Sequence, residues 1–314
     1  MKFKQSNEQS NEQSVGVISG ASAYILWGIL PVYWNLIGSV SAKEILAHRI
    51  VWSFVFMILV LVFMGKLKQF FIELCTLFKE PKKLFVIFAA SVVITMNWYT
   101  YIWAVSNNHL VEASLGYYIT PLVSILLGLI FLKEKLSFWS TVAFILASIG
   151  VLNMTLNIGT FPWVAISLAI TFGMYGLLKK LTQLEAMTGL TIETLIMTPF
   201  SLLFLGNLQM KNESVFTQAS PQTIWLLMGA GVITAIPLLL FAISAKRVSL
   251  AMIGFLQYIA PTIMLILGIL LYHEPFNYEQ ISSFIFIWIS LILYTLSKTK
   301  WFIKMEKKIL YLKG

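Results

Sequence analysis

The sequence predicts an all-α integral membrane protein with ten transmembrane helices, arranged as two inverted repeats of five helices each. Apolar and aromatic residues make up 59% of its 314 residues and charged residues only 11%, against roughly 25% charged residues in an average soluble protein. The apolar residues form blocks of about 20, the length of a helix that spans a bilayer. The second half of the sequence also resembles the first. A water-soluble globular domain is therefore excluded.

A polar segment precedes the first apolar block. Residues 1–14 repeat Gln-Ser-Asn-Glu with a period of four and contain almost no apolar side chain. We therefore expect residues 1–15 to form a disordered tail. The segment also lacks the basic-then-apolar layout of a cleaved signal peptide.

Ten apolar blocks follow, and each predicts one transmembrane helix. They span about residues 16–36, 45–64, 84–105, 113–132, 138–156, 160–178, 190–208, 223–245, 250–272 and 280–296. Short breaks at 133–137 and 246–249 predict that the helices on either side form hairpins. The blocks divide into a first repeat over residues 16–156 and a second over residues 157–297.

The last segment, residues 298–314, is basic and amphipathic. As a helix it would place Phe302, Met305 and Ile309 on one face and its lysines largely elsewhere. This pattern predicts an interfacial helix on anionic lipid, with an anchoring role.

Lysine and arginine set the expected orientation, because positively charged loops resist translocation. With ten helices, 19 of the 22 basic residues fall on the side of the N-terminus and 3 on the other side. We therefore expect both termini to be cytoplasmic in a bacterial-type plasma (inner) membrane. The net charge of +9 is explained by this topology, so it does not indicate a nucleic-acid partner.

The two halves can be aligned without gaps in their most similar part. An offset of 140 residues places Tyr118 and Pro121 on Tyr258 and Pro261, and offsets of 145 and 149 residues relate the first and second blocks to the sixth and seventh. Five helices per repeat is an odd number, so the two repeats must cross the membrane in opposite directions. Inverted repeats of this kind are typical of secondary transporters.

The sequence lacks the residues, or the spacing of residues, that several kinds of catalytic, metal and disulfide site require. Aspartate is absent, the three histidines are scattered, and Cys75 is the single cysteine. An internal disulfide, a cysteine-built metal site and two-aspartate catalysis are therefore excluded, and no phosphate-binding loop of the ATPase type is present. Glu134 and Glu274 fall just beyond their helices and are interpreted as structural. We expect no metal and no cofactor.

A small group of charged residues is the first set of candidate site residues. Arg49 and Glu193 lie well inside apolar blocks, where a charge is costly unless it faces a cavity or a partner. Glu44 and His48 share a helix face next to Arg49. We predict that these four residues line a cavity or form gates, with Glu44 and Arg49 near the outer face and Glu193 near the inner face. Two alternatives remain: an interfacial charge cluster that reaches water, and, for Glu193, stabilisation of a helix N-terminus.

Amphipathic side chains form the second set of candidates. Tyr, Trp and amide side chains combine apolar surface with hydrogen-bonding groups, which suits a small organic substrate. The candidates are Trp27, Asn97, Tyr101, Tyr117, Tyr118, Tyr175, Gln257 and Tyr258. The aromatic ones near helix ends could instead anchor the chain at the membrane interface.

Pro121 and Pro261 occupy equivalent positions in the two repeats. A proline inside a helix frees a backbone carbonyl and permits a bend, as transporter helices require. Simple packing is the alternative explanation.

Several short motifs occur in a fixed order along the chain. They are Trp27-Gly28 followed by Pro31, Tyr33 and Trp34; Glu44-x-Leu46-x-His48-Arg49-x-x-Trp52-Ser53; Asn97-Trp98 with Tyr101-Ile102-Trp103-Ala104; Glu112-Ala113-Ser114-Leu115-Gly116-Tyr117-Tyr118 before Pro121; Phe172-Gly173-x-Tyr175-Gly176; and Gly189-Leu190-x-x-Glu193-Thr194. From about residue 16 to residue 296, the chain resembles the RarD group of the EamA family, in the drug/metabolite transporter superfamily. The resemblance implies two EamA repeats, a plasma-membrane location and a permease role. Members of the group are usually labelled chloramphenicol-sensitivity or resistance permeases.

We therefore expect a secondary transporter that moves a small organic metabolite or drug by alternating access, and not an enzyme; the resemblance to the RarD group makes a chloramphenicol-related molecule one candidate. The expected partners are this substrate and the lipid bilayer, with no prediction of oligomeric state. A membrane enzyme and a sensor are the two alternative functions. A membrane enzyme acting on lipid-soluble molecules would need clustered His, Asp or Cys, and a sensor would need a soluble output domain or long loops. Neither would explain the inverted repeat.

Overall fold

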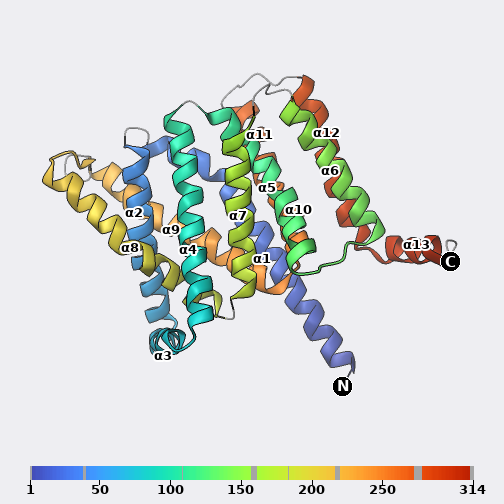
Figure 1. The fold of residues 1–314 in the computed structure, drawn as a ribbon, viewed down its shortest axis with the longest axis horizontal. Coiled ribbons are helices and arrows are strands. Elements are labelled where there is room, and N and C mark those ends of the chain that lie inside the picture. Colours follow the sequence, from blue (N-terminus) through green and yellow to red (C-terminus); the bar gives the residue numbers. More distant parts are fainter. Residues whose placement is uncertain are drawn as a thin grey trace.

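The computed structural model describes residues 2–37, 40–107, 109–156, 161–182, 184–215, 220–271 and 278–311, and in them the chain is a bundle of α-helices (Figure 1). Nine helices in this part of the chain are long and apolar enough to cross a membrane, and the apolar stretch Ile281–Ser297 is a shorter tenth candidate. The predicted all-α integral membrane fold is confirmed.

The helices of the first half are α1 (Lys2–Ile37), α2 (Ala42–Phe63), α3 (Leu67–Phe78), α4 (Pro81–Ser106), α5 (Leu110–Phe131) and α6 (Phe138–Leu156). Those of the second half are α7 (Trp163–Leu181), α8 (Ala186–Met210), α9 (Pro221–Arg247), α10 (Leu250–Gln257), α11 (Ile259–Leu271), α12 (Tyr278–Ser297) and α13 (Lys300–Tyr311).

The structure differs from the sequence prediction at the N-terminus. Helix α1 begins at Lys2, whereas residues 1–15 were expected to be disordered. Gln, Glu and Lys have good helix propensity, and extending an existing helix costs far less than starting one. In addition, Glu12 Oε2 lies 2.8 Å from Arg247 Nε of α9. A helix that continues from the first apolar block therefore explains the difference.

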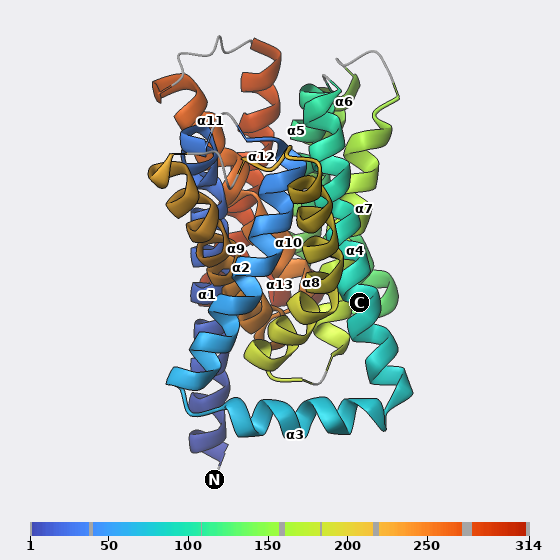
Figure 2. The same ribbon diagram turned by 90° about the vertical axis from the view of Figure 1, so that its left-hand side faces the viewer.

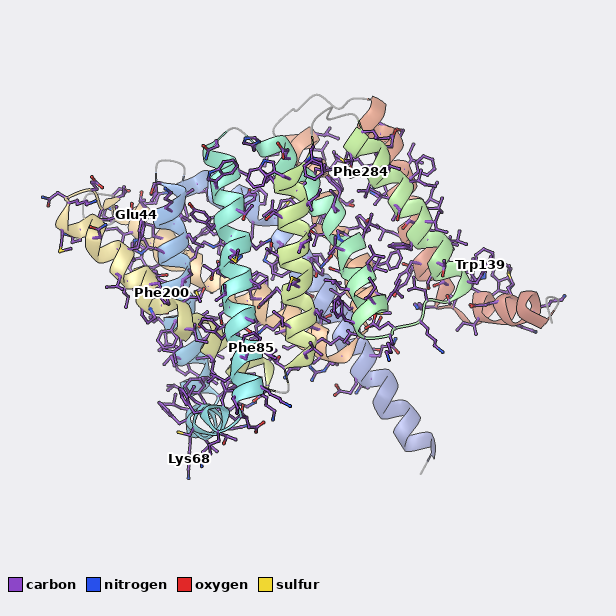
Figure 3. All side chains as sticks on the ribbon, viewed as in Figure 1. Glu44, Lys68, Phe85, Trp139, Phe200 and Phe284 are labelled. Atoms are coloured by element: carbon purple, nitrogen blue, oxygen red, sulfur yellow. The ribbon has the colours of Figure 1, made fainter. Side chains whose placement is uncertain are left out.

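Helix α3 lies between the second and third predicted transmembrane helices, in a segment where the sequence predicted no transmembrane helix. Figure 2 shows α3 lying across one end of the bundle, between the ends of α2 and α4. Phe70 and Leu77 are buried, whereas Lys68 is exposed. Figure 3 shows Lys68 at this end and Glu44 toward the other. We refer to the two ends as the α3 end and the opposite end.

Helix α13 follows α12 at the α3 end. Its Phe302 ring contacts Trp139 of α6 with a centroid distance of 5.3 Å, and Glu306 Oε1 accepts a hydrogen bond of 2.8 Å from the Phe138 backbone N–H. Phe302 is partly buried, while Lys304 is exposed. Trp301 and Ile303 of the same helix are 64% and 44% exposed, and an interfacial anchoring role for α13 stays a prediction.

The ninth predicted span consists of two helices, α10 and α11, which meet at Tyr258. Pro261 lacks the N–H that would bond to the carbonyl of Gln257 four residues earlier, which explains an interruption there. Helix α5, by contrast, runs through Pro121 without interruption. Of the two predicted bends, only the one near Pro261 interrupts a helix.

The bundle has a defined set of neighbours. Helix α1 packs on α9 and α11, α2 on α8 and α9, α4 on α7, α5 on α7 and α10, and α6 on α12. The α6 and α12 pair forms one edge of the bundle, at the right of Figure 1. The helices α1, α2, α4, α5, α7, α9, α10 and α11 surround the centre.

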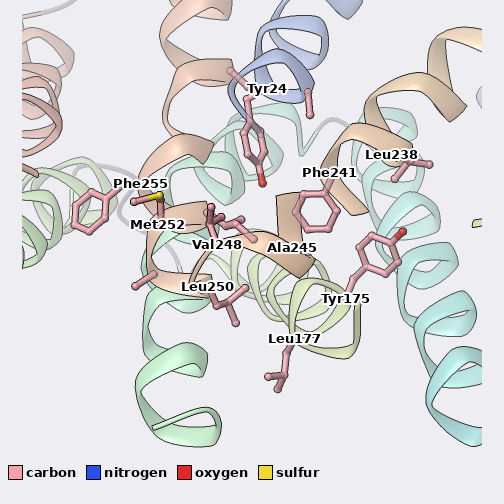
Figure 4. Close-up of a cluster of buried hydrophobic side chains, with 14 of the residues drawn as sticks. Tyr24, Tyr175, Leu177, Leu238, Phe241, Ala245, Val248, Leu250, Met252 and Phe255 are labelled. Carbon is pink, nitrogen blue, oxygen red and sulfur yellow. The ribbon is translucent and has the colours of Figure 1, made fainter. Parts of the chain in front are cut away.

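The largest core cluster lies toward the α3 end, because its members include Tyr175 and Ala245 near the ends of α7 and α9. Figure 4 shows part of it. Its buried rings come from α1, α7, α9, α10 and α12 and include the fully buried Tyr175, Phe241 and Phe255. Tyr175 and Phe241 are stacked with centroids 5.7 Å apart, and Tyr24 meets Phe241 edge-on at 6.3 Å. The α3 side of the bundle is thus closed by packed aromatic and aliphatic side chains.

Candidate functional site

A cavity of about 150 Å³ lies at the centre of the bundle and is lined by α1, α2, α4, α5, α7, α9, α10 and α11. Its lining includes residues near the end of α1 (Trp34), near the start of α2 (Arg49) and near the end of α4 (Tyr101). All three positions are toward the opposite end. The cavity therefore sits between the two halves of the chain, above the core that closes the α3 end.

The lining is mainly aromatic, with a few polar groups. The aromatic members are Tyr24, Trp27, Trp34, Trp98, Tyr101, Tyr117 and Phe172. The neutral polar members are Asn97, Thr120, Thr234 and Gln257, and Arg49 is the one charged residue among the described residues that line it. Such a lining fits a small amphipathic organic molecule.

Arg49 is held in place by three contacts. Its Nε donates a hydrogen bond of 3.0 Å to Thr234 Oγ1, and its guanidinium carbon lies 4.8 Å from the ring centroid of Trp34 and 5.2 Å from that of Trp98. These distances are within the range of cation–π attraction. Arg49 is therefore stabilised without a carboxylate among the described residues that line the cavity.

The orientation of Arg49 depends on how α2 packs on α9. Ser53, one turn after Arg49, donates a hydrogen bond of 2.9 Å to the Gly231 carbonyl. Thr234 donates its hydroxyl proton to the Ala230 carbonyl at 2.7 Å, so its oxygen is free to accept from Arg49 Nε. The two bonds fix both the helix register and the direction of the guanidinium group.

Asn97 and Gln257 also line the cavity, but each is partly engaged in helix contacts. Asn97 Nδ2 donates hydrogen bonds of 2.9 Å to the Leu168 carbonyl and to Thr171 Oγ1, which join α4 to α7. Gln257 Oε1 accepts one of 3.1 Å from Ser124 of α5. Interhelical hydrogen bonds of this kind stabilise membrane bundles.

The structure brings part of the predicted site together. Trp27, Asn97, Tyr101, Tyr117, Gln257, Arg49 and Pro261 line the cavity. Tyr118, Tyr175, Tyr258, Glu44, His48, Glu193 and Pro121 lie outside its lining.

Tyr118 and Tyr258 pack together with α12 instead of lining the cavity. Both are buried in a cluster that contains Phe284, whose ring centroid lies 5.3 Å from that of Tyr118; Figure 3 shows Phe284 on α12. Consecutive residues on a helix point about 100° apart. With Tyr117 facing the cavity, Tyr118 must face a neighbouring helix.

Tyr175 and Glu193 belong to a buried cluster at the α3 end. Tyr175 donates its hydroxyl to Glu193 Oε2 at 3.0 Å, and Lys179 Nζ lies 2.7 Å from Glu193 Oε1. The side chains of Lys179 and Glu193 are only 3% and 4% exposed. Lys179 was not among the predicted site residues, although its spacing of four residues from the candidate Tyr175 was a usable signal.

Glu44 and His48 are buried at the opposite end. Glu44 Oε1 accepts hydrogen bonds of 3.2 Å from Ser214 Oγ and 2.9 Å from the Val215 N–H. Glu44 thus binds the segment between α8 and α9, whereas Arg49 binds Thr234. Glu44 and Arg49, which the sequence prediction placed in one group, therefore bind different parts of the chain.

Glu134 caps the N-terminus of α10 at the α3 end of the bundle. Its carboxylate oxygens accept hydrogen bonds of 2.7 Å and 2.9 Å from the backbone N–H groups of Leu250 and Ala251, at the start of α10. A carboxylate at a helix N-terminus satisfies free donors and complements the helix dipole. This contact agrees with a structural role. Glu274 lies outside the described residues.

Phe172 and Thr234 line the cavity although neither was among the predicted site residues. Phe172 meets Trp27 edge-on with a centroid distance of 5.7 Å, and the offset of 145 residues aligns these two positions. The internal repeat could therefore have identified Phe172. Thr234 had no such signal, because a threonine inside an apolar helix is unremarkable in sequence.

Comparison with known proteins gives consistent matches over most of the chain. The family profile described as the EamA-like transporter family matches residues 14–156 and again residues 162–296. A crystal structure 17% identical in sequence superposes with a TM-score of 0.67, covering 90% of this chain and 97% of its own. At this identity the structural match shows a shared fold.

Several bacterial relatives are much closer in sequence. The uncharacterized transporter YojE of Bacillus subtilis is 48% identical over 93% of this chain and 97% of its own. Protein RarD of Escherichia coli is 41% identical over 90% and 94%, and the chloramphenicol-sensitive protein RarD of Pseudomonas aeruginosa is 28% identical over 88% and 92%. With both the family profile and these relatives covering most of its length, this chain belongs to the EamA-like transporter family as a RarD-type membrane transporter.

Proposed function

We propose that the chain is a secondary transporter in which two five-helix repeats alternate around the central cavity and carry a small organic molecule across the membrane. The observation that carries this proposal is the position of the cavity. Helices of both halves line it, and the aromatic core closes its α3 side. A site between two halves that is closed toward one end is what alternating access requires.

Equivalent helix crossings support the repeat arrangement. A Cβ atom at Gly28 would lie 2.8 Å from Ile263 Cβ, and one at Gly173 would lie 2.9 Å from Val123 Cγ1. Gly28 and Gly173 correspond at the offset of 145 residues, and Val123 and Ile263 at the offset of 140. A side chain would not fit at either crossing, so both glycines permit the same close approach of helices.

The helix neighbours in the first half also match those of the corresponding helices in the second half. Helix α1 packs on α9 and, correspondingly, α7 packs on α4. Likewise, α5 packs on α7 and its counterpart α11 packs on α1. The last helices of the two halves, α6 and α12, pack on each other. Two halves that share one set of contacts can exchange two conformations by rocking against each other.

The orientation follows from the charge bias. The chain is a multi-pass inner membrane protein, and 19 of its 22 basic residues lie on the side of the N-terminus. By the positive-inside rule this side, which includes the α3 end, is cytoplasmic. The conformation described here is then closed toward the cytoplasm, and the cavity lies in the outer half of the protein.

Cysteine accessibility tests the proposal without knowledge of the substrate. In a Cys75→Ser background, Leu30→Cys reports on the cavity lining and Ala245→Cys on the closed core. We expect a membrane-impermeant thiol reagent to label Leu30→Cys from outside, and to label Ala245→Cys from the cytoplasm but not from outside. Leu59→Cys, which is 48% exposed on the outer surface of α2, is the control for reagent that enters through lipid. Labelling of Ala245→Cys from outside, or its failure to be labelled from the cytoplasm, would contradict alternating access.

Chloramphenicol is a reasonable first cargo to test. The name of the Pseudomonas aeruginosa relative, chloramphenicol-sensitive protein RarD, connects that protein with the drug. The aromatic lining of the cavity suits the nitrophenyl ring of chloramphenicol. We expect expression of this chain to change chloramphenicol accumulation in cells if the drug is a cargo. Unchanged accumulation with the protein present in the membrane would remove chloramphenicol from the candidates.

A further inference from the structure

We propose that the cavity prefers small organic anions to neutral molecules of similar shape, with a carboxylate or similar group bound to Arg49 and an attached aromatic ring against the tryptophans of the cavity. This inference rests on the proposed transport function, because it names the class of molecule that the central cavity carries. It is built on the charge balance of the cavity, the hydrogen-bond donors of Arg49 and the size of the site.

The cavity carries an uncompensated positive charge. Arg49 is the one charged residue among its described lining residues, and no ion pair joins it to an acidic residue in the described part of the chain. A cation inside a membrane bundle is costly unless it is paired or hydrated. Trp34 and Trp98 offset part of this cost through their ring faces. A bound anion would supply the missing charge.

Other partly or fully buried cations of this protein are compensated differently. Lys179 lies 2.7 Å from Glu193, and Arg247 lies 2.8 Å from Glu12. Each pair joins two helices, so each glutamate has a clear structural use. Arg49 differs because its position faces a cavity large enough for a ligand. The absence of a glutamate here therefore leaves the charge available to a substrate.

The hydrogen-bond donors of Arg49 are also available. Its Nε–H is occupied by Thr234, while its two terminal nitrogens make no hydrogen bond to a described residue. A guanidinium group with both terminal nitrogens free can bind the two oxygens of a carboxylate at once. Thr234 fixes the plane of the group, so a substrate would meet donors that are already oriented.

The size and walls of the cavity limit the rest of the ligand. Its volume is about 150 Å³, and an apolar cavity of that size can hold benzene. Trp27, Trp34 and Trp98 provide flat apolar surface around it. Thr120 and Gln257 also line the cavity, so their polar atoms can bond to a second polar group. These features together favour an aromatic carboxylate with one ring over an inorganic anion or an organic cation.

Three matched ligands test the charge preference on the purified full-length protein. Benzoate, benzamide and benzylammonium have the same ring and differ mainly in charge, and quenching of tryptophan fluorescence measures their binding. We expect a dissociation constant for benzoate at least about tenfold lower than that for benzamide, with benzylammonium weakest. Equal or tighter binding of benzamide or benzylammonium would overturn the proposal, as would failure of all three to bind. Sulfate binding as tightly as benzoate would overturn the requirement for an organic anion.

Variants assign the preference to Arg49. Arg49→Gln should raise the dissociation constant of benzoate at least about tenfold and change that of benzamide less than about threefold. Arg247→Gln, at the other arginine, is the matched control and should leave both values unchanged. If Arg49→Gln does not fold, Thr234→Val keeps the charge and removes only its anchor; it should weaken benzoate more than benzamide. Equal losses for both ligands in these variants would overturn the role of Arg49.

The accessibility measurement separates failure of this inference from failure of the proposed function. If Leu30→Cys is labelled from outside and Ala245→Cys only from the cytoplasm, but benzoate shows no Arg49-dependent binding, alternating access stands and the anion class is wrong. If benzoate binds through Arg49 but Ala245→Cys is not labelled from the cytoplasm, the binding site stands and alternating access is wrong.

Discussion

Lys179 and Glu193 form an ion pair of 2.7 Å between Nζ and Oε1, at a place where their side chains are only 3% and 4% exposed. Tyr175 donates a further hydrogen bond to the same carboxylate. The pair joins α7 to α8 at the α3 end, directly beside the core that closes the cavity. Two buried charges are tolerated here because each is paired and the carboxylate is additionally hydrogen-bonded.

Removing one partner should be far more harmful than removing both. Lys179→Met leaves Glu193 charged and buried, which we expect to lower the free energy of unfolding by about 3 to 5 kcal/mol. Lys179→Met combined with Glu193→Leu should recover most of that loss. Tyr175→Phe removes a single hydrogen bond and should cost only about 1 kcal/mol. Unfolding of the purified protein in mild detergent measures these three variants and Glu193→Leu alone. A double variant whose loss equals the sum of the two single losses would contradict the pairing.

The two buried glutamates should influence opposite ends of the transporter. Glu193→Gln weakens the contact with Lys179 at the α3 end, and Glu44→Gln weakens the contacts with Ser214 and Val215 at the opposite end. We expect the first variant to increase labelling of Ala245→Cys from the cytoplasm and the second to increase labelling of Leu30→Cys from outside. Identical labelling profiles in the two variants would assign both residues to helix-end electrostatics.

The cap formed by Glu134 has a measurable energetic role. Glu134→Ala leaves the backbone N–H groups of Leu250 and Ala251 without their carboxylate, and we expect a loss of about 1 to 2 kcal/mol in the free energy of unfolding. Lys135→Ala, at the adjacent exposed position, is the control and should change stability by less than about 0.5 kcal/mol. Similar effects of the two substitutions would show that the cap contributes nothing specific.

The membrane orientation is open to a simple test. Reporter fusions after Ser41 and Asn212 should report the external side, whereas a fusion after Lys79, next to α3, should report the cytoplasm. Ser41 and Asn212 lie at the opposite end of the bundle from Lys79. A cytoplasmic signal at both Ser41 and Asn212 would contradict the proposed orientation of the termini and of the cavity.

The transmembrane helices could be predicted because long apolar blocks allow few alternatives in a membrane. Arg49 was selected for the same reason: a charge in an apolar helix needs a cavity or a partner. Helix α3 was missed because its apolar face is only 12 residues long and flanked by lysines. Helix α1 was predicted too short because composition says little about whether a polar segment will extend an existing helix.

The faces of the helices could not be predicted. In a helix that is apolar all round, the sequence does not show which face meets a cavity and which meets another helix. Tyr118 and Tyr258 were therefore placed in the pocket because they match between the repeats, whereas matching positions also arise from packing, as their contact with Phe284 illustrates. Thr234 was missed because only the crossing of α2 and α9 brings it to Arg49.

Mutual exclusion of the two openings tests the central claim most directly. A variant with both Leu30→Cys and Ala245→Cys, in the Cys75→Ser background, is first treated from outside with a bulky impermeant maleimide and then from the cytoplasm with a distinguishable reagent. If one cavity opens alternately to the two sides, the bulky group at Leu30→Cys holds the outer half open, and labelling of Ala245→Cys should fall well below that of the single variant Ala245→Cys treated in the same way. Unchanged labelling of Ala245→Cys would show that the two ends open independently and would contradict alternating access.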